Sequence, residues 1–168
     1  MEFAILTAMR TDEVRLAPWS EINLTRRIWQ IPAARMKSDR PHRVPLSDAA
    51  IQVLLTLKGD TTPDKSDLVF ALPTGRPLGE KAMRRACHRI NPAVSVHGMR
   101  STFRDWVADA TKFPRELAEL AIAHAFKGAA EAAYWRTDGL EKRKPMMEAW
   151  GRFCVPAKAA KVIPSTAA

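Results

Sequence analysis

The sequence predicts an α+β fold that is mainly α-helical and contains a small antiparallel sheet. Apolar residues recur at helical spacing in several segments, which favours amphipathic helices. Two short segments, residues 28–32 and 43–46, lie on either side of a polar turn, as the strands of a hairpin do. Hydrophobic residues make up 46% of the 168 residues, so the chain suits one domain with its own core. We expect this domain to cover residues 1–153 and residues 154–168 to be a disordered tail.

The first segment, residues 3–9, is an apolar helical stretch of about two turns, and isolated helices this short are marginal in water. We therefore expect it to end a longer helix or to pack firmly against the rest of the chain. The chain is expected to start inside a domain, as an N-terminally truncated unit. Missing helices would then leave an apolar surface near Phe3 and Leu6, with self-association or low solubility as the result.

A second helix and the hairpin follow. Thr11 or Asp12 is expected to cap this helix, and Pro18 to end it. In the hairpin the first strand alternates in polarity, and Pro45 marks the second as an edge strand or a strand end. The turn between them, residues 33–42, is expected to be polar and to carry cationic side chains.

The rest of the chain is expected to be helical, apart from a strand or extended piece at residues 67–72 and a turn at residues 74–77. The helix begun by a Ser47-Asp48 cap presents an apolar stripe of four residues: Ile51, Leu54, Leu55 and Leu57. Further helices are expected at residues 80–90, 98–111, 114–122 and 140–153, with Pro145 in the first turn of the last helix or at a kink. Residues 129–135 form a short alanine-rich segment. The expected core side chains of these helices are Phe103, Trp106, Val107, Leu117, Leu120, Ile122, Met146, Met147 and Trp150.

The charge of the chain indicates a polyanionic partner. Lys and Arg number 27 against 18 Asp and Glu, which gives a formal charge of +9 and a pI of about 10.1. Such an excess attracts nucleic acid above all, although some basic proteins are only soluble and basic. The two cysteines, Cys87 and Cys154, are far apart and indicate a reducing compartment rather than a disulfide scaffold.

Several classes of protein are disfavoured by missing patterns. The sequence has no C-x-x-C or H-E-x-x-H spacing, so a metal-dependent nuclease lacks its ligand cluster. No apolar run approaches the ~20 residues of a membrane span. The first residues are too short and too acidic for a signal peptide. We therefore expect a cytoplasmic protein without a metal site.

The last third of the chain holds residues suited to attacking a phosphodiester. Tyr134 is the only tyrosine of the sequence, so any tyrosine chemistry must occur there. A His-x-x-Arg pair, His97 and Arg100, lies upstream, and on a helix these two could face one side. His124 lies between this pair and Tyr134. The ordinary alternative for each is a residue of the core, a helix cap or an exposed ion pair.

Five segments together resemble one family, the tyrosine recombinases or phage integrases, and specifically the catalytic domain of integrases from satellite prophages and genomic islands. No segment is specific alone, but their order matches that of the family, and the likeness continues to about residue 153. The segments are Leu-Thr-Ala-Met-Arg-Thr-Asp-Glu at 6–13, Arg-Met-Lys at 35–37 before His-Arg-Val-Pro-Leu-Ser at 42–47, His-Gly-Met-Arg-Ser-Thr-Phe at 97–103, Leu-Ala-Ile-Ala-His at 120–124, and Ala-Ala-Tyr-Trp-Arg at 132–136.

The resemblance implies site-specific DNA recombination without a cofactor. Tyr134 matches the nucleophile, which would form a 3′-phosphotyrosine and leave a free 5′-hydroxyl. This linkage keeps the energy of the phosphodiester, so rejoining needs neither ATP nor metal. Arg10 and Arg100 match the two family arginines, whose planar guanidiniums can clamp one phosphate and stabilise its pentacoordinate transition state.

The resemblance also assigns the supporting groups. His97 and His124 would donate a hydrogen bond to the phosphoryl group or pass a proton. Lys37 matches the general acid for the departing 5′-oxygen, with Arg35 and Arg40 as nearby alternatives. Glu13 would orient Arg10 or His97, although helix capping explains it nearly as well. Asp12 departs from the small residue that is usual there and adds negative charge near the phosphate site.

Further cations are expected to bind DNA phosphates. Residues 26–43 contain six Lys and Arg against one acid, Asp39, and residues 76–89 add a second basic face. Such side chains fix the register of the protein on DNA without reading bases, although an ordinary solvated surface has the same composition. The candidate phosphate ligands are Arg35, Arg40, Arg43, Lys81, Arg84 and Arg85.

The partner implied by the resemblance is double-stranded DNA, on which family members assemble as homo-oligomers, with a tetrameric synapse. The N-terminal arm-binding and core-binding domains of full integrases are expected to be absent from this chain. The alternative function is therefore a DNA-binding fragment or remnant without useful catalysis. Type IB topoisomerases use related chemistry, but the segments match integrases better. Whether the helix at residues 140–153 packs in cis or on a neighbouring protomer is left open.

Overall fold

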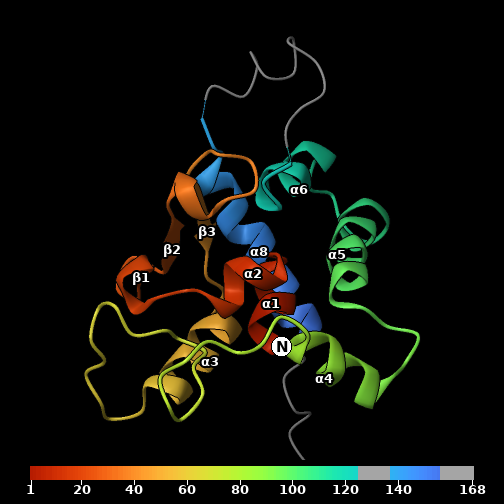
Figure 1. Cartoon of the computed structure of the whole chain (residues 1–168). Coiled ribbons are helices and arrows are strands. Elements are labelled where there is room, and N and C mark those ends of the chain that lie inside the picture. The colour runs from red at the N-terminus through yellow and green to blue at the C-terminus, as the bar shows by residue number, and fades with distance from the viewer. Residues whose placement is uncertain (125–136, 156–168) are drawn as a thin grey trace, which may run out of the picture.

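The computed structural model describes residues 1–124 and 137–155 of the chain. These residues form a mainly helical fold with one small sheet, as predicted (Figure 1). The elements of the first half are α1 (Glu2–Thr7), α2 (Thr11–Arg15), η1 (Trp19–Glu21), β1 (Ile22–Asn23), β2 (Ile28–Ile31), η2 (Ala33–Arg35), β3 (His42–Pro45) and α3 (Asp48–Lys58). They are followed by α4 (Ala82–Ile90), α5 (Val96–Ala110), α6 (Arg115–Ala121) and α8 (Leu140–Cys154).

The sheet has three antiparallel strands in the order β1-β2-β3. Trp29 pairs with Val44 and Ile31 with His42, and all four side chains are buried, whereas Gln30 between them is exposed. Pro45 is the last residue of the edge strand β3, where its missing N–H leaves no gap in the ladder. The predicted hairpin is thus confirmed. The strand β1 was not predicted, because two residues are too few to show a period.

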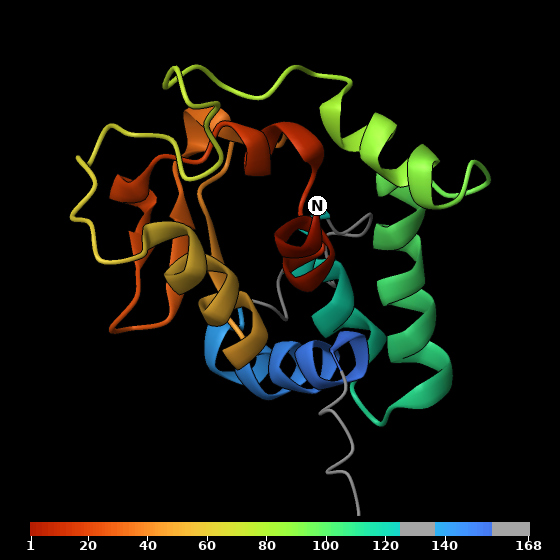
Figure 2. The same ribbon diagram turned by 90° about the horizontal axis from the view of Figure 1, so that it is seen from below.

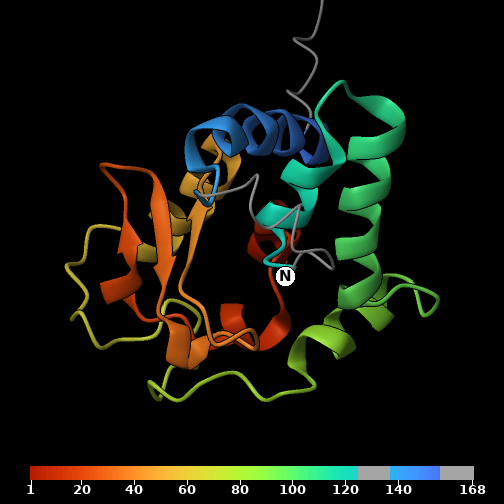
Figure 3. The same cartoon turned by 90° about the horizontal axis from the view of Figure 1, so that it is seen from above.

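Helix α1 lies at the centre of the fold, between the sheet on one side and α5 on the other (Figures 2 and 3). Phe3 packs against Trp29 of β2 and against Phe70, with ring centroids 5.5 and 5.3 Å apart. The indole of Trp150 on α8 donates a hydrogen bond to the carbonyl of Ile5 at 2.8 Å. Tertiary packing therefore stabilises a helix that is too short to be stable alone.

The prediction of an exposed apolar surface around the first helix was wrong. Phe3 and Leu6 are each only 1% exposed, because α1 is enclosed by α3, α5 and α8 of the same chain. The other expectation for this segment, that it packs firmly, is confirmed. No exposed patch at these two residues remains to drive self-association.

A second core lies between α5, α6 and α8. Phe103 and Trp150 meet edge to face with centroids 5.3 Å apart, and Val107, Leu117 and Met146 are buried around them. The predicted inward faces of these helices are confirmed at these positions. Pro145 lies inside α8, beyond its first turn. The alanine-rich segment at residues 129–135 and all but the first two residues of the expected tail, residues 154–168, lie outside the described residues.

Two details differ from the predictions. Leu54 is fully buried, but Leu55 and Leu57 are 42% and 49% exposed, because α3 buries only the face around Ala50 and Leu54. Residues 67–72 form no regular strand and make only isolated bridges, such as Pro18 with Leu68. In the described part of the chain, no helix is long and apolar enough to cross a membrane.

Candidate functional site

A hollow of about 200 Å³ opens between the start of α2 and the start of α5. Helix α1 ends at Thr7, and its C-cap residue Ala8 has a left-handed backbone (φ 52°). Of the next two residues, Met9 is buried and Arg10 is partly exposed. Opposite, Ser95 caps α5 by accepting a hydrogen bond from the N–H of Gly98 at 2.9 Å. The lining residues are Met9, Arg10, Thr11, Asp12, Val96, His97 and Arg100. Three of the predicted site residues, Arg10, His97 and Arg100, therefore share one hollow.

Arg100 is held rigidly in the wall of this hollow. It is 4% exposed, and its guanidinium donates to the carbonyls of Ala8, at 2.7 Å, and Ile122. Burial, and to a smaller extent the nearby charge of Arg10, lower the pKa of Arg100 to about 10. The side chain is still cationic at neutral pH. Guanidinium has five N–H donors, so donors remain for an anion.

Arg10 is held by a single carboxylate, that of Glu13. Glu13 accepts from the guanidinium of Arg10 at 2.9 Å through one oxygen and from the backbone N–H of Arg10 at 2.9 Å through the other. Arg10 thus occupies the N-cap position of α2, one residue before the predicted Thr11 or Asp12 cap. Glu13 orients Arg10 and caps the helix at once. The second carboxylate at the hollow, that of Asp12, is paired with the guanidinium of Arg15 at 2.6 Å. The cations of Arg10, Arg15 and Arg100 therefore outnumber these two carboxylates, which favours an anion such as phosphate.

His124 lies beside this arrangement, two residues after the carbonyl that binds Arg100. Its Nδ1 is 2.8 Å from a carboxylate oxygen of Glu119, which also accepts from Arg104 of α5 at 2.9 Å. If neutral, the imidazole carries its proton on Nδ1, so that Nε2 is left as an acceptor. Sequence reasoning missed Glu119 and Arg104, because an acid five residues before a histidine has no recognisable spacing.

Lys37 lies on the exposed turn between β2 and β3, and no hydrogen bond or ion pair to the described residues holds its amine. Arg35, two residues earlier, is turned inward instead. Its guanidinium binds the carboxylate of Glu21 and the carbonyl of Glu13, the latter at 2.6 Å. Arg35 therefore has internal partners in this structure, although it was predicted as a phosphate ligand or an alternative acid.

Arg43 is also paired. Its guanidinium donates two hydrogen bonds of 2.7 Å to the carboxylate of Asp138. Partial burial alone would raise the pKa of Asp138, but hydrogen bonds from Arg43 and the charge of Arg143 lower it below its usual value. Arg143 is fully buried, and Asp138 lies 3.4 Å from its guanidinium. The burial of Arg143 could not be predicted, because this residue lies in a charged run that is typical of an exposed face.

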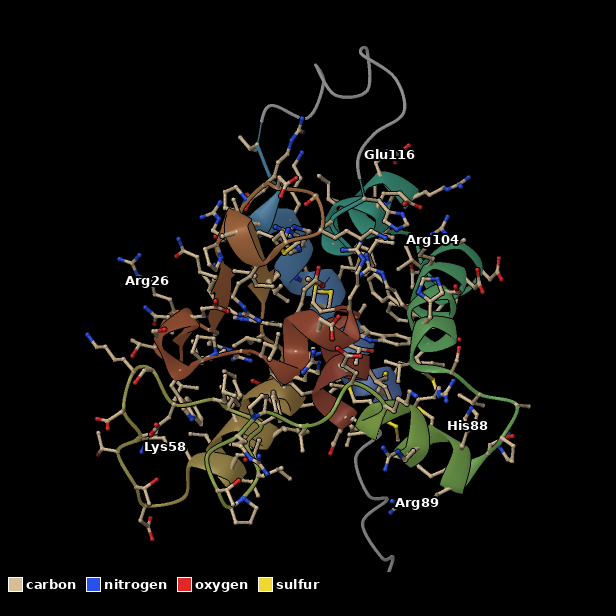
Figure 4. All side chains as sticks on the ribbon, in the orientation of Figure 1. Arg26, Lys58, His88, Arg89, Arg104 and Glu116 are labelled. Atoms are coloured by element: carbon tan, nitrogen blue, oxygen red, sulfur yellow. The ribbon has the colours of Figure 1, made fainter. Side chains whose placement is uncertain are left out.

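The other predicted phosphate ligands are exposed and free of partners within the described residues. They are Arg40 after the hairpin turn, and Lys81, Arg84 and Arg85 at and within α4. Figure 4 shows the labelled side chains Arg26, His88 and Arg89 pointing outward at the edge of the fold, and these residues are exposed as well. These cations can meet a polyanion without breaking an internal bond.

Tyr134 lies outside the described residues, so its position relative to the hollow stays a prediction. The described chain resumes at residue 137, and Asp138 is fixed by Arg43.

Comparison with known proteins gives the family. The model of the phage integrase family matches residues 1–136. The chain is 33% identical over 165 residues to prophage integrase IntA of Escherichia coli (strain K12), covering 95% of this chain and 39% of that protein. It is 34% identical over 148 residues to the integrase of Shigella phage Sf6, covering 86% and 38% respectively.

A third relative, the integrase of Enterobacteria phage P4, is 27% identical over 172 residues, which cover 91% of this chain and 39% of that protein. The chain thus spans about two fifths of the length of these relatives. No solved structure matches it significantly. The match over residues 1–136, together with the shared hollow of Arg10, His97 and Arg100, gives one conclusion: the chain belongs to the phage integrase family, as part of its catalytic domain.

Proposed function

We propose that this chain cleaves and rejoins double-stranded DNA in site-specific recombination, with Tyr134 as the nucleophile. The observation that supports this best is the shared hollow of Arg10 and Arg100, in which the charge of one guanidinium lowers the pKa of the other. The carboxylate of Glu13 offsets only part of the repulsion between these two cations, and a bound anion would offset the rest. A phosphate between two guanidiniums satisfies both through planar, bidentate hydrogen bonds.

The reaction balances with residues of this chain alone. The hydroxyl oxygen of Tyr134 attacks the phosphorus, the bond from tyrosine oxygen to phosphorus forms, and the bond from phosphorus to the 5′-oxygen breaks. A free phenol has a pKa near ~10, so it must lose its proton as it attacks, and His97 or His124 can accept it. Lys37 gives a proton to the departing 5′-oxygen. Reversal of these steps by another 5′-hydroxyl rejoins the DNA.

Arg10 and Arg100 act on the charge that develops at phosphorus. Arg100 is fixed by two carbonyls and Arg10 by Glu13, so neither needs to reorganise when the pentacoordinate state forms. Fixed donors of this kind are worth about 10²–10³ in rate each. We propose the exposed cations on the hairpin turn and on α4 as contacts to the DNA backbone, and a homo-oligomer on DNA as the working assembly.

The experiment that tests this function uses a nicked double-stranded oligonucleotide that carries an attachment site from the flanking genome. Cleavage next to the nick releases a short 5′-hydroxyl strand that diffuses away, so the covalent complex accumulates and is seen on a denaturing gel. We expect an adduct with the unaltered chain in the presence of EDTA, and none with Tyr134→Phe, which should still bind the DNA. Binding without any adduct would favour the alternative, a DNA-binding fragment that does not cleave.

A further inference from the structure

Arg35 connects three parts of the fold. Its guanidinium pairs with the carboxylate of Glu21 on η1 and donates to the carbonyl of Glu13 on α2 at 2.6 Å. Glu21 is itself held by the indole of Trp29 on β2, which donates to the same oxygen at 2.9 Å. Trp29 is fully buried and Glu21 nearly so. Arg35 is therefore bound to a rigid part of the core and not to the surface.

Glu13 is the residue that makes this connection relevant to the site. Its carboxylate holds Arg10 through both oxygens at 2.9 Å, and its carbonyl holds Arg35. The arginine in the hollow and the arginine before the hairpin turn are thus fixed to one residue. Figures 2 and 3 show the segment after β2 lying beside α2.

The position of Lys37 depends on this connection. Met36 is buried at 3% exposure in the core around the sheet, and its carbonyl accepts from the N–H of Asp39 at 3.1 Å. Arg35 and Met36 are both fixed, and Lys37 is the first exposed residue after them. Consecutive Cα atoms are ~3.8 Å apart, so the Cα of Lys37 cannot lie more than ~7.6 Å from that of Arg35.

We infer that Arg35 is a positioning residue, which fixes the base of the hairpin turn to Glu13 so that the amine of Lys37 reaches the 5′-oxygen of a phosphate bound at Arg10. This inference rests on the proposed function of Lys37 as the general acid. It replaces the predicted role of Arg35 as a phosphate ligand, because its guanidinium already has an internal carboxylate and an internal carbonyl as partners. A displacement of about 1 Å in such a group can lower a rate about 10²-fold.

The test compares two nicked substrates that differ in one atom. One carries oxygen and the other sulfur at the 5′ bridging position of the scissile phosphate. A thiolate leaves without a proton, because a thiol has a pKa near ~8.5, far below that of an alcohol. Loss of the general acid, or its misplacement, therefore slows cleavage of the oxygen substrate and not of the sulfur substrate. Loss of fold, DNA binding or phosphate clamping slows both.

The variants are Lys37→Ala, Arg35→Met and Glu21→Gln. Lys37→Ala should lower adduct formation about 10²–10⁴-fold on the oxygen substrate, the usual worth of a general acid, and near unaltered rates should return with sulfur. Arg35→Met should lower the rate of adduct formation about tenfold or more on the oxygen substrate. On the sulfur substrate, this variant should also regain a rate close to that of the unaltered chain. Glu21→Gln keeps an acceptor for Trp29 but removes the charge that holds Arg35, so a smaller effect of the same kind is expected.

Arg27→Met is the matched control. Arg27 also joins separate elements, since it pairs with Asp48 at 2.5 Å and Glu148 at 3.5 Å, but it lies at the opposite end of β2. Its loss should act equally on both substrates, if at all. If Arg35→Met fails to fold, as thermal unfolding would show, Arg35→Lys and Glu21→Gln give the same comparison.

The outcomes separate the inference from the proposed function. Recovery of both Lys37→Ala and the Arg35 or Glu21 variants with sulfur supports the inference. Recovery of Lys37→Ala alone, with the Arg35 and Glu21 variants equally slow on both substrates, overturns the inference and leaves the proposed function standing. No recovery of Lys37→Ala, or no adduct from the unaltered chain on either substrate, overturns the role of Lys37 and the inference with it.

Discussion

Two groups of cations among the described residues differ in how they are held. In the hollow, Arg100 is 4% exposed and bound by two carbonyls, and Arg10 is bound by Glu13. On the surface, Arg40, Arg84 and Arg85 are exposed and have no partner among the described residues. The first group has lost its freedom before any DNA arrives, whereas the second keeps it. This difference suits the first for chemistry at one phosphate and the second for attraction of many phosphates.

The largest expected effect is that of Arg100→Lys. An ammonium keeps the charge but cannot bind two carbonyls and a phosphate in one plane. We expect adduct formation to fall at least about 10²-fold, with DNA affinity changed little. Quantitative gels with the nicked substrate measure this. The matched control, Arg84→Lys on the exposed face of α4, should stay within about twofold of the unaltered chain, and an equal loss in both would erase the distinction between the regions.

The buried His42 should make the stability of the folded chain depend on pH, whereas an exposed histidine should not. Burial, together with the smaller effect of the charge of Arg143, lowers the pKa of His42 to about 4. The unfolded chain, with a histidine pKa near ~6.5, therefore binds more protons between pH 4 and pH 6.5, so stability rises with pH across this window. His42 should contribute a loss of about 2 kcal/mol between pH 7 and pH 5.

Urea unfolding of the unaltered chain and of His42→Asn at both pH values checks this expectation. The variant should lack that part of the pH dependence, whatever its absolute stability. His88→Asn, at an exposed position on α4, should keep it. An unchanged slope in His42→Asn would show that the imidazole is not held neutral in the folded chain.

A smaller effect is expected for Glu13→Gln. The amide still accepts the backbone N–H of Arg10 but no longer attracts its guanidinium, so Arg10 loses orientation and not its charge. Adduct formation should fall about tenfold, which corresponds to about 1.4 kcal/mol. Single-turnover rates at saturating DNA measure this. Asp12→Asn is the matched control, since Asp12 pairs with the guanidinium of Arg15 at 2.6 Å, and a fall as large in this variant would argue against a specific role for Glu13.

The smallest effect concerns the exposed face. Replacing both Arg84 and Arg85 by Ala should weaken binding to any DNA sequence by a similar factor and lower the salt slope by ~0.9 for each phosphate no longer neutralised. Stability should change by less than about 0.5 kcal/mol. Fluorescence anisotropy over a range of salt concentrations tests this, and an unchanged slope would make α4 an ordinary solvated helix.

Much of the fold could be predicted, because periodicity reports burial. Phe103, Val107 and Met146 lie inward as their spacing indicates, and Pro45 ends an edge strand as its missing N–H requires. Whether the first helix is buried or exposed could not be predicted from periodicity. Its apolar residues allowed either packing within the chain or exposure, and only the tertiary structure shows that α3, α5 and α8 enclose it.

Only those site residues that lie in a family motif could be predicted from the sequence. Arg10, His97 and Arg100 were named from the order of the segments and share a hollow. The groups that hold Arg100 could not be predicted, because backbone carbonyls such as those of Ala8 and Ile122 have no sequence signature. Arg35 and Arg43 were grouped with the surface cations on composition alone, although Glu21 and Asp138 bind them.

A double-mutant cycle shows whether Arg10 and Arg100 act on one phosphate. Adduct formation is measured for Arg10→Lys, Arg100→Lys and the double variant under single-turnover conditions. Groups that act as a unit are strongly non-additive, so we expect the double variant to be hardly slower than the slower single variant. Losses that multiply, as for independent sites, would contradict the account.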